Sequence, residues 1–175
     1  MPQLIKDGAI VEDRWTLWRE QPNGALAPDH PAIVPLPWWI AQRSAPLARG
    51  EVGVWLAPDA DPQALADDIG RLPLIAVDFP QFSDGRGYSI ARLLRSQYGF
   101  SGELRAIGDV LRDQLFYLRQ CGFNAFAVRS ERNLEDALRG LRDFSDSYQA
   151  TAATPVPLFR RRIAFPVTGD PNKRA

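Results

Sequence analysis

The stretch VGVWLAPDADPQALADDIGRLPLIAVDF (52–79) decides the fold class, because it contains the pattern of a strand, a helix and a second strand. Residues 52–57 are a short apolar run, and residues 73–79 are a nearly continuous one, as is typical of strands buried on both faces of a parallel sheet. Between them, residues 61–72 predict a helix with Asp61 as its N-cap and Pro62 in its first turn. This order favours an α/β protein.

The same alternation continues along the chain. Two further strands are expected, at 103–108 and 124–128. Three further helices are expected, over 86–99, from the cap Asp109 to Gly122, and from the cap Asn133 to Tyr148. Successive units of this length predict a mainly parallel sheet, which is either a half-barrel or a doubly wound sheet.

The 175 residues predict one domain over 1–165, with a βα-repeat core at 51–150. Residues 1–50 are expected to be less regular, because the tryptophans and prolines gather there, and residues 166–175 are expected to fray. Candidate strands at 9–18 and 31–36 either extend the sheet at its edges or cover one end of it. A further strand is predicted at 157–165.

A short helix is predicted to begin near Trp38. The neighbouring indoles of Trp38 and Trp39 then point to different sides of it. They are either an anchor for a partner protein or covered by the rest of the domain.

Composition excludes several classes of function. Lys and Arg total 21 and Asp and Glu total 21, a balance that argues against nucleic acid and anionic membranes as partners. One cysteine, Cys121, and one histidine, His30, cannot ligate an iron–sulfur cluster or a zinc ion within one chain, so no metal site is expected. The N-terminus lacks the apolar segment of a signal peptide, and no apolar run is long enough to span a bilayer, which favours a cytoplasmic protein.

Candidate site residues follow the predicted strands, because ligands of parallel sheets bind at the carboxyl ends of the strands. The rim candidates are Asp78, Arg105, Asp109 and Arg129. For Asp109, capping of a helix is the simpler interpretation. Arg105 and Glu103 lie on the same face of one strand, so Arg105 is either part of a structural ion pair or a ligand for an anion.

The segment FPQFSDGRGYS (79–89) contains the candidate anion-binding loop. Its candidate residues are Ser83, Asp84, Gly85, Arg86, Gly87 and Ser89. Free backbone N–H groups at a helix start, together with a guanidinium, suit a small oxyanion. In the alternative interpretation, Ser83 or Asp84 caps the helix and the glycines relieve backbone strain. The spacing matches neither a dinucleotide fingerprint nor a P-loop, and no cofactor is identifiable, although a flavin needs no cysteine and stays open.

The run FPQFSDGRGYSIARLLRSQYGFSGELRAIGDVLRDQLFYLRQCGFNAF (79–126) closely resembles the DUF934 family, bacterial proteins of unknown function. The resemblance extends more loosely over residues 35–148. Members of this family are often labelled oxidoreductases of sulfite reduction, a label that rests on neighbouring sulfate-assimilation genes. The family supplies no established catalytic residues to transfer to this chain.

The resemblance implies a role in sulfate assimilation. Because Cys121 is the single cysteine in the sequence, this chain cannot itself ligate the iron–sulfur cluster of a sulfite reductase. Sulfite reductase chemistry requires sirohaem and an iron–sulfur cluster, so the catalytic haemoprotein must be a different protein. We therefore expect an accessory protein that acts with this reductase or its electron donor, with a sulfur oxyanion as a possible ligand of the 83–89 loop. The alternative is a small-molecule enzyme, including an oxidoreductase, whose oxyanion site lies at the ends of the strands. Its residues would be Asp78, Arg86, Arg105, Asp109 and Arg129. A third interpretation is an interaction module in which these charges only pair with one another.

Overall fold

The computed structural model describes residues 2–20, 30–44, 52–129, 131, 133–141, 156 and 160. The strands described form one eight-stranded sheet. They are β1 (Gln3–Lys6), β2 (Ala9–Glu12), β3 (Thr16–Leu17), β4 (Ala32–Pro35), β5 (Val52–Leu56), β6 (Leu74–Phe79), β7 (Glu103–Gly108) and β8 (Ala125–Phe126). The helices are α1 (Leu36–Gln42), the 3₁₀ helix η1 (Pro62–Asp68), α2 (Arg86–Ser96), the 3₁₀ turn η2 (Arg112–Gln114), α3 (Leu115–Cys121) and α4 (Leu134–Gly140).

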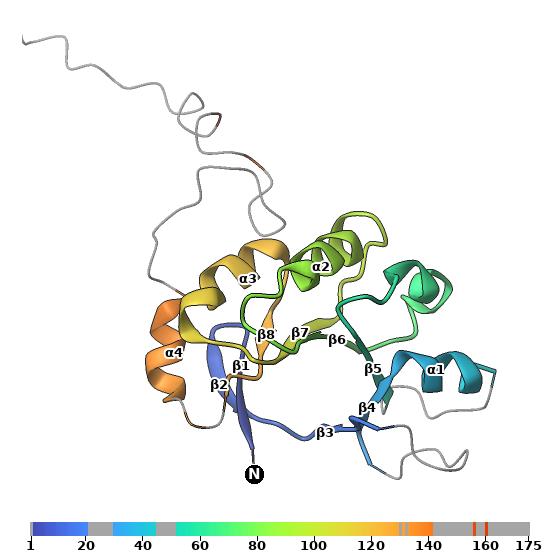
Figure 1. Ribbon diagram of the computed structural model, residues 1–175, viewed down its shortest axis with the longest axis horizontal. Coiled ribbons are helices and arrows are strands. Elements are labelled where there is room, and N and C mark those ends of the chain that lie inside the picture. Colours follow the sequence, from blue (N-terminus) through green and yellow to red (C-terminus); the bar gives the residue numbers. More distant parts are fainter. Residues whose placement is uncertain are drawn as a thin grey trace, which may run out of the picture.

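Strands β3 to β8 are parallel and lie side by side in chain order. The helices that join them cover one face of the sheet, and the opposite, concave face carries none of the described helices (Figure 1). A doubly wound sheet reverses its strand order part-way. The unbroken order makes this sheet a curled half-barrel, one of the two predicted architectures.

The N-terminal part of the chain supplies both edges of the sheet. Strand β1 pairs antiparallel with β8 on one side and with β2 on the other, while β3 and β4 form the opposite edge. The link between β2 and β3 crosses below the sheet from one edge to the other (Figure 1). The prediction of a single strand over 9–18 is therefore wrong: its middle, at 13–15, leaves the sheet because Asp13 binds Arg105 and Trp15 packs against the concave face.

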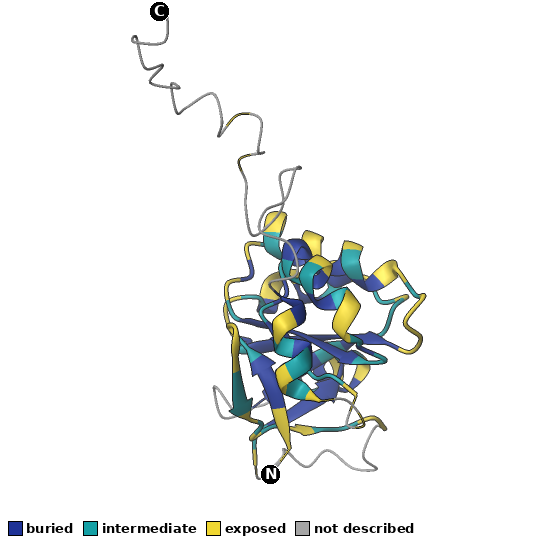
Figure 2. Ribbon diagram, turned by 90° about the vertical axis from the view of Figure 1, so that its left-hand side faces the viewer, coloured by how far each residue is buried: buried dark blue, intermediate teal, exposed yellow. Residues whose placement is uncertain are grey.

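Two apolar layers hold the sheet. The larger lies between the strands and the helices, where the buried ribbon segments face one another (Figure 2). Phe79, Phe123 and Leu94 are buried in it. The smaller lies on the concave face, where Ile33, Leu74, Ala76 and Ile107 pack with the half-buried rings of Trp15 and Trp55. Successive residues of β6 and β7 thus point alternately into the two layers. This is why β6 is buried along its whole length and β7 is buried up to Gly108.

Local signals placed most helix ends correctly. The Asp61 carboxylate accepts a hydrogen bond from the Gln63 N–H at 2.9 Å, and the Asn133 side chain accepts bonds from the first turn of α4. Gly122 ends α3 with a φ of 111°. The predicted cap Asp109 is wrong, since its carboxylate binds groups outside the helix that follows, and that helix begins later, at η2 and α3.

Gly108 lies where β7 leaves the sheet, beside the end of β6. Its φ is 95°, and a Cβ atom there would lie 2.4 Å from the carbonyl oxygen of Phe79. Both the backbone conformation and the close approach require glycine.

Trp38 and Trp39 are buried, which agrees with the covered interpretation and not with an exposed anchor. The Trp39 indole N–H donates to Asp68 at 2.8 Å, and Trp38 packs edge-on against Trp18.

Strand 124–128 is shorter than predicted, with two residues in the ladder. The end of the last predicted helix, from residue 142 to Tyr148, and the predicted strand at 157–165 lie outside the described residues, apart from Arg160.

Candidate functional site

The carboxyl ends of β6 and β7 bring the 80–85 loop together with Asp109 and Arg129. One Asp109 carboxylate oxygen accepts a hydrogen bond from the Phe82 N–H at 3.1 Å, and the other accepts one from the Arg129 guanidinium at 3.0 Å. Arg129 also lies 3.5 Å from Glu131. Two predicted rim residues therefore meet, and Asp109 fixes the loop that follows β6.

In the candidate anion-binding loop, the Arg86 guanidinium already binds the carboxylate of Asp84. The guanidinium donates two hydrogen bonds to the Asp84 carboxylate, at 3.0 and 2.7 Å, and the Arg86 backbone N–H donates a third, at 3.1 Å. The hydrogen bond from Arg86 lowers the pKa of Asp84 below its usual value. An oxyanion would have to displace this carboxylate before it could bind the guanidinium.

The remaining loop residues have other surroundings. Ser83, Gly85 and Ser89 are exposed, whereas Gly87 is buried against β6. A Cβ atom on Gly87 would lie 2.6 Å from the Phe79 ring, so this glycine lets the start of α2 pack closely onto the sheet. The two glycines of the loop thus differ: one faces solvent and the other is required for packing.

Asp78 and Arg105 belong to the concave face and not to this rim. Asp78 accepts an ion-paired hydrogen bond from Arg19 at 2.7 Å. The Arg19 guanidinium also lies over the Trp55 ring, 5.7 Å from its centroid. The indole N–H of Trp55 in turn donates to the Trp18 carbonyl at 2.8 Å, so this cluster connects β6 to the chain after β3.

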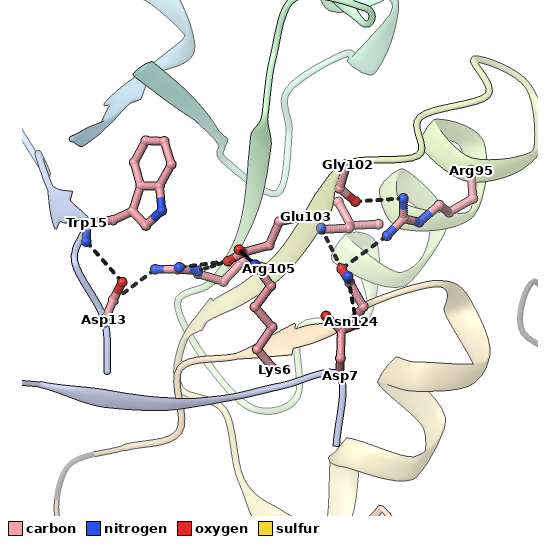
Figure 3. A network of polar contacts seen from close by, with 10 residues as sticks. Lys6, Asp7, Asp13, Trp15, Arg95, Gly102, Glu103, Arg105 and Asn124 are labelled. Carbon is pink, nitrogen blue, oxygen red and sulfur yellow. Dashed lines mark hydrogen bonds and ion pairs between the residues drawn. The ribbon is translucent and has the colours of Figure 1, made fainter. Parts of the chain in front are cut away.

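A second charged network surrounds Arg105, whose exposed fraction is 3% (Figure 3). Its guanidinium lies 2.6 Å from Glu103 and 2.9 Å from Asp13, and Lys6 lies 2.7 Å from the other oxygen of Glu103. Glu103 was a predicted partner of Arg105. Lys6 and Asp13 were not, because nothing in the local sequence shows that the N-terminal strands return to β7.

A pocket of 740 Å³ opens beside this network on the concave face. It is lined by Leu4, Lys6, Asp7, Ala9, Val11, Glu12, Asp13, Arg14, Trp15, Pro73, Ser101, Gly102, Glu103, Arg105 and Asn124. Several of these residues begin β7 or precede β8, so the pocket lies toward the amino ends of the parallel strands. It is thus separate from the rim that the sequence favoured.

The described residues also bear on three other kinds of feature: a reactive cysteine, a metal site and a membrane-spanning helix. Cys121 is buried, and burial raises the pKa of its thiol, which disfavours the reactive thiolate. No three His, Cys, Asp or Glu residues there are grouped so as to hold a metal ion. Nor does any described helix have the length and apolar character needed to cross a membrane.

A model of a family of bacterial proteins of unknown function, DUF934, matches residues 53–159. The chain belongs to this family. No curated protein and no solved structure matches the chain. The DUF934 region includes the 83–89 loop, Asp109, Arg129 and both charged residues of β7, whereas Lys6, Asp13 and Arg19 lie before it.

Each DUF934 candidate arginine is therefore held by carboxylates of the same chain. Arg86 binds Asp84, Arg129 binds Asp109, and Arg105 binds Glu103 and Asp13. The predicted site residues form separate clusters: the 83–89 loop, the Asp109–Arg129 pair, and two networks on the concave face.

Proposed function

We propose that this protein is an accessory component of assimilatory sulfite reduction and acts with a separate sulfite reductase haemoprotein. The chain belongs to DUF934, a family of unknown function. The metabolic context is taken from the resemblance described above, since proteins of this family are often labelled oxidoreductases of sulfite reduction. The observation that carries the accessory role is the internal pairing of the candidate arginines, together with the burial of the single thiol. Guanidinium groups that already bind a carboxylate are not free to bind an anionic substrate, so on this proposal the redox chemistry belongs to the partner.

A deletion strain tests the proposal. We expect slow growth when sulfate or sulfite is the sulfur source and normal growth on sulfide or cysteine, because only the reduction of sulfite to sulfide is affected. The wild-type gene must restore growth. Equal growth of the deletion and parent strains on sulfite would overturn the proposal.

Purification provides a second test. A tagged copy isolated from cells growing on sulfate should retain the haemoprotein, which its sirohaem absorbance identifies. The spectrum of the protein purified alone also tests for a flavin, the redox cofactor that the sequence leaves open.

The role of the 83–89 loop as an oxyanion site is a separate proposal. Isothermal titration with sulfite should give weaker binding for Arg86→Ala and tighter binding for Asp84→Asn, because the latter frees the guanidinium from its carboxylate. Equal affinities of both variants would remove the loop from the function.

The pocket on the concave face favours a second candidate function, the binding or conversion of a small molecule. Its volume lies in the range of small-ligand sites, and the buried Arg105 and Glu103 line it beside the Trp15 ring. Buried ion pairs seldom stabilise a fold more than apolar residues would, so their presence beside a pocket is a reason to test it. A ligand that fits here should raise the melting temperature of the wild-type protein and protect Trp15 from fluorescence quenching.

A further inference from the structure

A row of three hydrogen-bonding groups lines the pocket of 740 Å³ on the concave face. The row has a carboxylate at its centre and a cation on each side, and the three side chains meet in Figure 3. One oxygen of Glu103 lies 2.6 Å from the Arg105 guanidinium, and its other oxygen lies 2.7 Å from the Lys6 ammonium. The order along the pocket wall is thus donor, acceptor, donor.

Each group of this row keeps some capacity for hydrogen bonds. Within the described part of the chain, Arg105 uses three of its five N–H groups, two for Glu103 and one for Asp13. Lys6 uses one of its three N–H groups, and the Glu103 oxygen that it binds accepts nothing else from the described residues. Because Arg105 and Glu103 are more than nine-tenths buried, hydrogen bonds from a ligand to them would discriminate strongly between ligands.

The charges around the pocket favour a neutral ligand. Among its described lining residues, Lys6, Arg14 and Arg105 are cationic and four side chains are carboxylates. An anion would face these carboxylates, two of which Arg105 already binds. A cation would approach the buried guanidinium of Arg105. A neutral group that accepts hydrogen bonds avoids both costs.

The same pocket offers a surface for a flat ring. Trp15 is half-buried and lines the pocket together with the apolar side chains of Leu4 and Val11. The exposed Arg14 lies over the Trp15 ring, with its guanidinium 5.9 Å from the ring centroid. A guanidinium is planar, so a flat group fits over this indole, and a ligand ring has to displace only an exposed side chain.

We propose that the pocket binds a neutral planar ring with a cyclic imide edge, in which one N–H lies between two carbonyl groups. The order along that edge is acceptor, donor, acceptor, which complements Arg105, Glu103 and Lys6 while the ring lies against Trp15. Uracil-type bases and the isoalloxazine ring of flavins share this edge. The inference rests on the second candidate function, small-molecule binding in this pocket, and names its ligand class.

Titration of the purified protein with riboflavin and with uridine tests the inference. We expect at least one of them to bind, as measured by riboflavin fluorescence and by calorimetry for uridine. Methylation at N3 removes the imide N–H, so the N3-methyl derivative of the compound that binds should bind at least tenfold more weakly.

A substitution in the row tests the same edge from the protein side. Lys6→Met should weaken binding about tenfold, and it leaves Glu103 paired with Arg105, so the fold is retained. Arg139→Met is the matched control, because the Arg139 side chain is 74% exposed on α4 and is not a lining residue of the pocket. It should bind the ligand like the wild type, and circular dichroism should show both variants folded.

A set of planar aromatic amides without an imide separates this inference from the candidate function. If riboflavin and uridine do not bind, but one of these amides binds and protects Trp15 from fluorescence quenching, the ligand class is wrong and small-molecule binding stands. If no compound binds, both fail. Equal affinities for a compound and its N3-methyl derivative, or for the wild type and Lys6→Met, would show that this row does not recognise an imide edge, and would also overturn the inference.

Discussion

Arg95 is expected to contribute strongly to stability, because its half-buried guanidinium bonds to two segments outside its own helix, 100–102 and 122–124. Its guanidinium donates to the carbonyls of Phe100 at 2.6 Å, Gly102 at 2.9 Å and Gly122 at 2.9 Å, and to the Asn124 side chain at 3.1 Å. It thereby joins the end of α2 to the start of β7 and to the chain before β8. No carboxylate forms an ion pair with it in the described structure, so carbonyl and amide oxygens are its direct partners, and the charge of Asp7 favours the cation from further away (Figure 3).

The expected effect of Arg95→Ala follows from these bonds. Each contributes about 1 kcal/mol net, which gives about 4 kcal/mol for the four. Burial of the cation offsets part of this, as the lowered pKa of Arg95 indicates, and we expect a net loss of about 3 kcal/mol. For a chain of this size the melting temperature should fall by about 9 °C.

Urea unfolding followed by tryptophan fluorescence measures this loss. Arg92→Ala is the matched control, since Arg92 lies on the same helix, is exposed and forms no ion pair with the residues that the structure describes; its effect should stay within about 0.5 kcal/mol. Arg95→Lys should recover only a minor part, because one ammonium cannot reach all four oxygens. An Arg95→Ala variant as stable as Arg92→Ala would refute the reasoning.

Three further predictions concern separate parts of the fold. Gly108→Ala should fail to fold or lose several °C in melting temperature, whereas Gly70→Ala, which has open space at its Cβ position, should melt like the wild type. In an NMR titration, Asp84 should lose its proton below its ordinary pKa of 3.8, and Arg86→Gln should raise that pKa. Because the folded-state pKa is lowered, the contribution of this ion pair to stability is complete above the ordinary pKa and disappears as the pH falls through the folded value. Cys121 should react slowly with a thiol reagent in the native protein and rapidly in urea; equal rates would contradict its burial.

The sequence was sufficient wherever the determining signal is local. Strand 103–108 was predicted with its observed bounds, since apolar residues alternate with Glu103 and Arg105 between two turns. Gly122 and Asn133 were recognisable as helix ends because each acts through its own backbone or the next turn. The half-barrel itself required the structure, because hydrophobic periodicity does not specify the order of the strands.

The site was less predictable, because its contacts join distant residues. Asp109 has the sequence context of a helix cap, yet its carboxylate binds Phe82 in one loop and Arg129 in another. Arg105 was expected to need a carboxylate, but Asp13 lies in a segment whose crossing of the concave face has no local signature. No periodic pattern shows that the Phe82 carbonyl accepts a hydrogen bond from Gln114, because the two residues belong to different elements.

The pairing of β1 with β8 has a consequence for the newly made protein. Ile5 is synthesised long before its partner in the sheet, Phe126, leaves the ribosome. Until then the β1–β2 hairpin has no neighbouring strand to complete the edge, and Asp13 has no Arg105 to bind. The parallel strands from β4 onward are made next to one another and can assemble first, so closure of the concave face is expected to be a late step that awaits the synthesis of β8.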